Sequence, residues 1–324
     1  MIASRVAIEL ETALVAAEDE TASALDRAEM LMEIAMGLQQ RPKTVEHLTA
    51  SIALYERALA VCPGDEPLLR ARITARRGTA LQALPEPGIA SLKAARAAYE
   101  SALPTLAQDG QAAESAEVEM NLGLVLQSLA GAGAARVTDA IAAYQRALRV
   151  FDRRRYPVEF AILQSNLATA FLSIPPSDDK ASLREALAVQ AFEEGLKAVN
   201  LIDHPVEYAL LQNNLGNALQ SVASARGIEN HRRALDAYDE ALKVRTPESA
   251  PLEYANTIAN RANCLLNLPD DADDGANLRQ AREHFEDAHR IFVAHGDATK
   301  AAMLAEVMDA LNRELAASAA AGGR

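Results

Sequence analysis

Six aromatic residues recur at nearly even intervals along the chain, and this register constrains the fold more than any other feature. The intervals between them are 44, 45, 48, 46 and 47 residues. A small residue follows each aromatic by three positions, and another precedes it by four. A repeat of this length predicts a stack of similar structural units instead of one globular core. The six triplets are Ser51/Tyr55/Ala58, Ala95/Tyr99/Ala102, Ala140/Tyr144/Ala147, Ala188/Phe192/Gly195, Ala234/Tyr238/Ala241 and Ala281/Phe285/Ala288.

A further small residue, which we call the anchor, lies 20 to 24 residues before each aromatic. Positions i, i+4 and i+7 share one face of a helix, so each triplet predicts an apolar stripe on a helix. The anchor predicts a preceding helix whose backbone approaches that stripe closely. Each unit is therefore expected to be an antiparallel helix pair that buries its core by stacking on its neighbours. The anchors are Ala35, Gly78, Gly123, Ala168, Gly216 and Ala262.

Proline marks where several of the first helices are expected to begin. Pro67, Pro157, Pro205 and Pro251 stand at one register before the anchors, and proline is favoured in the first turn of a helix. We expect a cap helix within residues 1–20, six helix pairs over residues 21–296, a second cap helix over residues 297–315 and a flexible tail over residues 316–324. The predicted fold class is all-α.

Charge and composition exclude several classes of partner. The formal net charge of −13 argues against nucleic acid or an anionic membrane surface as the main partner. No window is apolar enough for a membrane span, and Glu9 and Glu11 interrupt the segment where a signal peptide needs an apolar core. Cys62 and Cys264 are expected to be reduced thiols. The sequence therefore predicts a cytoplasmic protein.

The anchor and the triplet together resemble the tetratricopeptide repeat family, over roughly residues 22 to 295. The units here are longer than the usual repeat of about 34 residues. In this respect they are similar to repeats of peptide-binding adaptors such as kinesin light chains. The resemblance implies a right-handed solenoid whose first helices line a concave groove, and it implies a protein or peptide as partner.

Asparagine recurs two positions before four of the anchors, on the expected groove side. Asparagine is a poor residue for a helix interior, so four at one register suggest a shared use. In the family, such asparagine ladders hold extended peptides, since an amide offers both a donor and an acceptor. The alternative is that these amides bond neighbouring repeats and serve packing alone. The predicted peptide-binding amides are Asn121, Asn166, Asn214 and Asn260, with Asn213, Asn217 and Gln220 beside them.

Arg72 and Arg76 lie on one face of the second unit's first helix, where they could receive a carboxylate of the ligand. The alternative is pairing with carboxylates of adjacent first helices. The flanking positions that the family's carboxylate clamp requires are mostly neutral here, so no clamp is predicted. The candidate partners of the alternative are Glu29, Glu33, Glu117 and Glu119.

Signals for catalysis are weak. The six histidines are scattered, no phosphate-binding loop or nucleophile elbow is present, and no cofactor or metal is expected. An acidic run at Asp270, Asp271, Asp273, Asp274 and Gly275 fails the calcium-loop pattern at Ala272 and Ala281. The leading interpretation is a non-catalytic scaffold or adaptor that binds an extended segment of another protein. A self-associating structural subunit, forming a homo-oligomer, and a ligand-sensing regulator are the alternatives.

Overall fold

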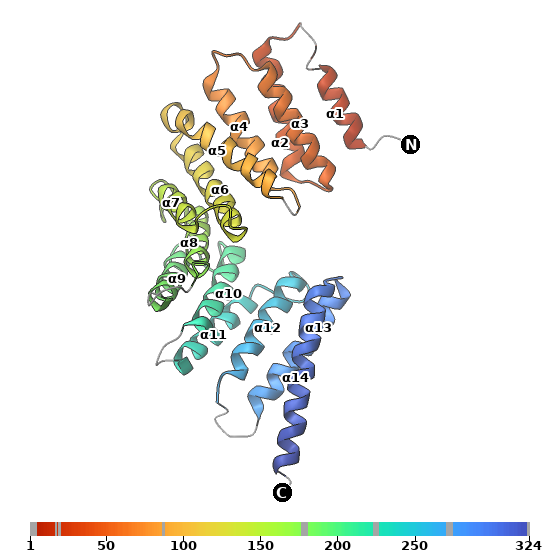
Figure 1. Ribbon diagram of the computed structural model, residues 1–324, viewed down its shortest axis with the longest axis vertical. Coiled ribbons are helices and arrows are strands. Elements are labelled where there is room, and N and C mark those ends of the chain that lie inside the picture. Colours follow the sequence, from red (N-terminus) through yellow and green to blue (C-terminus); the bar gives the residue numbers. More distant parts are fainter. Residues whose placement is uncertain are drawn as a thin grey trace. The chain divides into compact units, whose positions relative to one another are not determined.

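The computed structural model describes residues 5–16, 18, 21–85, 88–175, 181–222, 227–269 and 275–322. Over these residues the secondary structure is entirely helical, and consecutive helices pack as antiparallel pairs. The fold is an α-helical solenoid, which confirms the predicted fold class (Figure 1). The acidic run at Asp270–Asp274 lies outside the described residues.

The chain divides into two compact units, Met1–Asp152 and Arg153–Arg324, which the repeat register did not predict. In the first unit, three helix pairs, α2/α3, α4/α5 and α6/α7, follow a helix that packs on α3 and α2. The helices are α1 (Arg5–Ala16), α2 (Ala24–Gln40), α3 (Val45–Val61), α4 (Pro67–Gln82), α5 (Ile89–Asp109), α6 (Ala112–Gly131) and α7 (Val137–Ala147).

The second unit also holds three helix pairs, α8/α9, α10/α11 and α12/α13, and it closes with a helix that packs on α13. The last helix runs beyond the expected boundary at residue 315, to Gly322. The helices are α8 (Pro157–Leu172), α9 (Ala181–Leu196), α10 (Pro205–Ser221), α11 (Gly227–Leu242), α12 (Pro251–Leu266), α13 (Ala276–Ala294) and α14 (Ala298–Gly322).

The four prolines begin helices as expected, because each occupies the first turn of α4, α8, α10 or α12. The helix α6 instead begins with a capping box. Its Gln111 side chain accepts from the backbone of Glu114, and the Glu114 carboxylate accepts from the backbone N–H of Gln111 over 3.0 Å. This cap fixes Glu114 at the start of α6, where it also meets a side chain of α4.

The recurring aromatic rings form the centre of each helix pair. All six are at most 2% exposed. A Cβ placed on Gly123 would lie 2.3 Å from a ring carbon of Tyr144, and one on Gly216 would lie 2.6 Å from a ring carbon of Tyr238. Real Cβ atoms do not approach other atoms so closely, so an alanine at either of these two anchors would force the ring to shift.

The first helices form the inner layer of each unit. In the first unit α2 contacts α4 and α4 contacts α6, and in the second unit α8 contacts α10 and α10 contacts α12. Among the described residues, no second helix contacts the second helix of the next pair. Because consecutive pairs are closer together on the side of the first helices, each stack curves toward that side. Each asparagine of the row therefore lies on a helix of the inner layer of its own unit.

Candidate functional site

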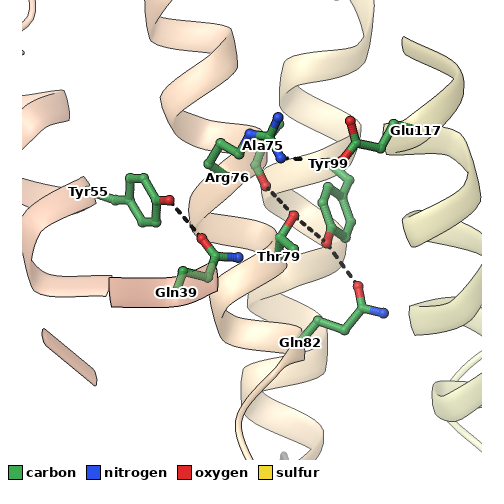
Figure 2. Close-up of polar contacts among 8 residues, drawn as sticks. All are labelled: Gln39, Tyr55, Ala75, Arg76, Thr79, Gln82, Tyr99 and Glu117. Carbon is green, nitrogen blue, oxygen red and sulfur yellow. Dashed lines mark hydrogen bonds and ion pairs between the residues drawn. The ribbon is translucent and has the colours of Figure 1, made fainter. Parts of the chain in front are cut away.

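Each tyrosine of the repeat donates a hydrogen bond to an amide of its own hairpin. The hydroxyl of Tyr55 donates to Gln39 Oε1 over 2.7 Å, and the hydroxyl of Tyr99 donates to Gln82 Oε1 over 2.9 Å (Figure 2). Tyr144 bonds Gln127 in the same way. Burial raises the pKa of these phenols, which therefore act as neutral donors. Each hydroxyl thus stays paired inside the hairpin.

The glutamine lies four residues after the anchor, and it changes together with the aromatic. Where the ring is Tyr, this position holds Gln39, Gln82, Gln127 or Gln220. In the two hairpins built on Phe192 and Phe285, which have no hydroxyl, it holds Leu172 and Leu266. The correlation indicates that the glutamine's main role is to pair the tyrosine. Sequence reasoning missed this pairing, although the register alone could have revealed it.

Two residues predicted to bind peptide belong to this pairing in α10. The hydroxyl of Tyr238 donates to Asn217 Oδ1 over 2.7 Å, and Gln220 Nε2 donates to the same hydroxyl. Gln220 Nε2 also reaches the backbone carbonyl of Asn260 in the next first helix, at 3.3 Å. Both side chains therefore have intramolecular partners within the second unit.

A third predicted residue, Asn213, bridges two first helices. It is 7% exposed, and its Oδ1 accepts from the hydroxyl of Thr257 at 3.2 Å and from Asn260 Nδ2 at 3.4 Å. Its own Nδ2 donates to Asn214 Oδ1 over 3.2 Å. The structure thus brings Asn213, Asn214 and Asn260 together across α10 and α12. At this junction the amides bond one another, as the packing interpretation expects.

Three amides of the predicted row retain a free donor group. Within the described residues, the Nδ2 groups of Asn121, Asn166 and Asn214 donate no hydrogen bond. The Nδ2 of Asn166 is also shielded from solvent, which makes it an unsatisfied buried donor on α8. Buried polar groups without a partner are rare in folded proteins. These donors are the part of the row that internal packing does not use.

The arginine pair of α4 is engaged by carboxylates of α6. Arg72 contacts both oxygens of Glu114 at 3.0 and 3.2 Å, and Arg76 contacts Glu117 at 3.2 Å (Figure 2 shows the second pair). Partial burial raises the pKa of Glu114, but the hydrogen bonds from Arg72 and from the backbone of Gln111 outweigh it and hold that pKa below its usual value. The predicted alternative named Glu117 correctly and missed Glu114.

These ion pairs border a crevice of about 40 Å³ between α4 and α6, which Asn121 also lines. A larger hollow of about 780 Å³ lies elsewhere in the first unit, where α5, α6 and α7 meet. Leu122 and Leu126 of α6 form part of its floor, and the ion pair of Arg146 with Glu119 lies at its side. The larger hollow is thus separate from the row of amides.

The potential for catalysis or membrane insertion depends on the metal-ligating side chains, the thiols and the helices in the part of the chain that the structure describes. None of their His, Cys, Asp and Glu side chains form a group of three that could hold a metal ion. Both cysteines are buried free thiols, and burial raises the pKa of Cys264 to about 12, so it is a poor nucleophile. Within the same part of the chain, every helix is too short or too polar to cross a bilayer.

Comparisons with known proteins support the fold and leave the function open. No family model matches the chain, and no curated protein matches it. Among solved structures, BtubC (BKLC) from P. vanneervenii is similar over 85% of this chain and 93% of its own, with 17% identity and a TM-score of 0.51. The apo form of RapI is similar over 96% of this chain and 98% of its own, with 12% identity and a TM-score of 0.48. At such low identity, the likeness to BtubC concerns the fold alone.

Proposed function

We propose that the protein is a non-catalytic scaffold of the cytoplasm in which the inner layer of first helices of each unit binds an extended segment of a partner protein. The observation that carries this proposal is the set of unpaired amide donors on that layer, at Asn121, Asn214 and Asn166, the last of which reaches a ligand once its side chain turns outward. An extended peptide presents backbone carbonyls that such donors can satisfy. The ladder role that the resemblance implies is proposed for these three residues first.

The paired amides have a supporting role in this proposal. Asn213 and Gln220 tie α10 to α12, and this tie fixes the spacing between successive first helices. Asn260 contributes its donor to the same junction, so its remaining group toward a ligand is the acceptor. Asn217 is exposed, and its Oδ1 accepts from Tyr238, so its Nδ2 group is the part that remains for a ligand. Arg72 and Arg76 remain candidates only for a ligand that displaces Glu114 or Glu117.

The magnitude follows from two hydrogen bonds. If each amide contributes about 1 kcal/mol net, removing two weakens binding by about 2 kcal/mol, which is about thirtyfold in the dissociation constant. We expect peptides selected on the parent protein from a random display library to bind Asn166→Ala/Asn214→Ala about thirtyfold more weakly. The thermal midpoint is expected to fall only modestly, because the one bond lost among the described residues is the acceptance by Asn214 Oδ1 from Asn213 Nδ2.

The matched control is Gln190→Ala, which removes an exposed amide from the second helix α9 of the same unit. This variant is expected to bind the selected peptides as the parent does. If the double asparagine variant loses much stability while the peptides still bind it with the parent's affinity, the amides serve packing and the proposal is wrong. The same holds if the control weakens binding equally.

Self-association is a second candidate function, favoured by three exposed apolar residues around the start of α10. Ile202 is 87% exposed, Val206 69% and Leu210 39%, at spacings of four residues across the start of α10. The side chain of Asn200 accepts from the backbone N–H groups of Ile202 and Asp203, which holds the turn in place. A mass measurement at high protein concentration tests this function: a dimer that Ile202→Ser dissociates supports it, and a monomer contradicts it.

A further inference from the structure

One position of the repeat register departs from the others in a way that packing does not explain. Seven residues after each aromatic, the chain places a buried residue between one helix pair and the next. In one hairpin the residue is Arg245, which is 9% exposed. A charged side chain thus replaces an apolar one at a single junction. The other five hairpins have Cys62, Leu106, Phe151, Val199 and Phe292 there, all at most 5% exposed.

A second replacement accompanies the arginine at the same junction. Five residues before the last anchor stands Thr257, which is fully buried, and its hydroxyl accepts from Arg245 Nη1 over 2.9 Å. The threonine also contacts Asn213 Oδ1, on the preceding first helix. Two polar residues have therefore replaced apolar ones where α10 meets α12. The other five hairpins have Met30, Ile73, Val118, Leu163 and Leu211 at the threonine's register.

The guanidinium of Arg245 is only partly satisfied. Its hydrogen bond to Thr257 is the one it makes within the described residues, and no carboxylate there lies within ion-pair distance. The exposed Glu253 is the acidic neighbour that acts on it through space. Desolvation, which Glu253 only partly offsets, lowers the pKa of Arg245 below its ordinary value. The unused N–H groups of Arg245 are not among the buried donors that lack a partner, so they keep contact with solvent and are open to a ligand. Apolar residues fill the same position in the other five hairpins, so packing alone does not require an arginine here.

We propose that Arg245, Thr257 and Asn213 form a subsite for a carboxylate of the bound segment, between α10 and α12. The inference rests on the proposed peptide-binding function and names the chemistry of one ligand group. A guanidinium with unused N–H groups recognises a carboxylate through two parallel hydrogen bonds. Thr257 orients the guanidinium, and Asn213 in turn contacts the hydroxyl of Thr257. A single cation beside Glu253 suits a monoanion better than a doubly charged phosphate.

The test uses three short peptides as probes at constant ionic strength. One carries a glutamate side chain between blocked termini, one carries only a free C-terminal carboxylate, and the third has glutamine between blocked termini. Binding is followed by the NMR resonance of the Arg245 Nε–H group. We expect one or both carboxylate peptides to shift this resonance at concentrations roughly tenfold lower than the neutral peptide. The carboxylate peptide that binds shows whether the subsite takes a glutamate side chain or a C-terminal carboxylate.

Variants separate the subsite from simple charge. Arg245→Leu introduces an apolar residue, as the other hairpins have at this position. We expect this variant to lose the preference for carboxylate peptides, measured through the amide resonances of the peptides. Its thermal midpoint is expected to equal or exceed that of the parent. Arg232→Leu removes the same charge from an exposed position on α11 and is expected to keep the preference. Arg245→Lys keeps the charge without the planar fork, so it is expected to retain only part of the preference.

The outcomes distinguish this inference from the proposed function. The subsite is refuted if the neutral peptide shifts the Arg245 resonance equally, or if Arg245→Leu and Arg232→Leu behave alike. If library-selected peptides depend on Asn214 but not on Arg245, the scaffold proposal stands and the subsite falls. If no library peptide binds while a carboxylate probe still shifts the Arg245 resonance, the anion site stands and the extended groove falls.

Discussion

The hydrogen bond from Tyr144 to Gln127 allows a direct measurement of how a polar pair stabilises one hairpin. Tyr144 is fully buried, and among the described residues its hydroxyl bonds only Gln127 Oε1, over 2.9 Å. Tyr144→Phe keeps the ring and removes the donor, which should destabilise the protein by about 1 kcal/mol. Gln127→Leu leaves a buried hydroxyl without its acceptor, with an expected loss of about 1 to 3 kcal/mol.

The double variant reproduces the combination of Phe192 with Leu172, so it is expected to lie within about 0.5 kcal/mol of the parent in its free energy of unfolding. The single losses sum to about 2 to 4 kcal/mol, so the two changes should couple by about 1.5 to 4.5 kcal/mol. Urea unfolding followed by far-ultraviolet circular dichroism is the suitable assay, because the chain has no tryptophan and the substitutions alter tyrosine fluorescence. The midpoint of the transition that reports the first unit gives each free energy.

The reverse exchange supplies the control. Phe192→Tyr introduces a hydroxyl into an apolar hairpin, and adding Leu172→Gln should recover part of the lost stability. A coupling below about 0.5 kcal/mol in the Tyr144 cycle, within the usual range of additivity, would refute the reasoning. The ring would then hold the hairpin by packing alone.

Three further predictions concern other parts of the chain. Gly123→Ala should destabilise the protein by about 1 to 3 kcal/mol, because the new Cβ would overlap the buried ring of Tyr144. Gly37→Ala in α2, where no atom lies within 4 Å of the new Cβ, should stabilise the protein by about 1 kcal/mol. Equal urea midpoints for the two variants would contradict this prediction. Burial and the neighbouring Arg261 lower the pKa of His284, so the unfolded chain binds the proton more readily than the folded chain. The urea midpoint of the parent should therefore fall as the pH drops below about 6.5, and that of His284→Gln should fall less. Parallel curves of urea midpoint against pH for the two proteins would count against this prediction. Cys264 should resist thiol-labelling reagents until the protein unfolds, and rapid labelling of the native protein would disagree with its burial.

The architecture was predictable because the packing residues repeat. A ring such as Tyr238, with a small residue on either side and an anchor such as Gly216, predicts a hairpin wherever it occurs, and the structure has six hairpins at these registers. The division of the chain after Asp152 was not predictable, since the register continues across it without interruption.

The side-chain chemistry of the inner layer was only partly predictable. The register treats Asn214 and Asn260 as equivalent, yet Asn260 donates to Asn213 while Asn214 does not donate. Such differences depend on which side chain faces the next helix, and a one-dimensional register does not contain that information. Arg72 pairs with Glu114 because a capping box fixes that glutamate at the start of α6, and sequence reasoning overlooked this cap.

Each helix pair contains its own ring, the anchor of that ring and, where the ring is a tyrosine, the amide partner. A pair therefore contributes much of the free energy that stabilises its own fold, and contacts with the neighbouring pairs contribute a separate part. Backbone amide exchange should then reveal a profile along the chain. Exchange should be slowest in α4, α5, α10 and α11, whose pairs have neighbours on both sides within their unit, and faster toward α1 and α14.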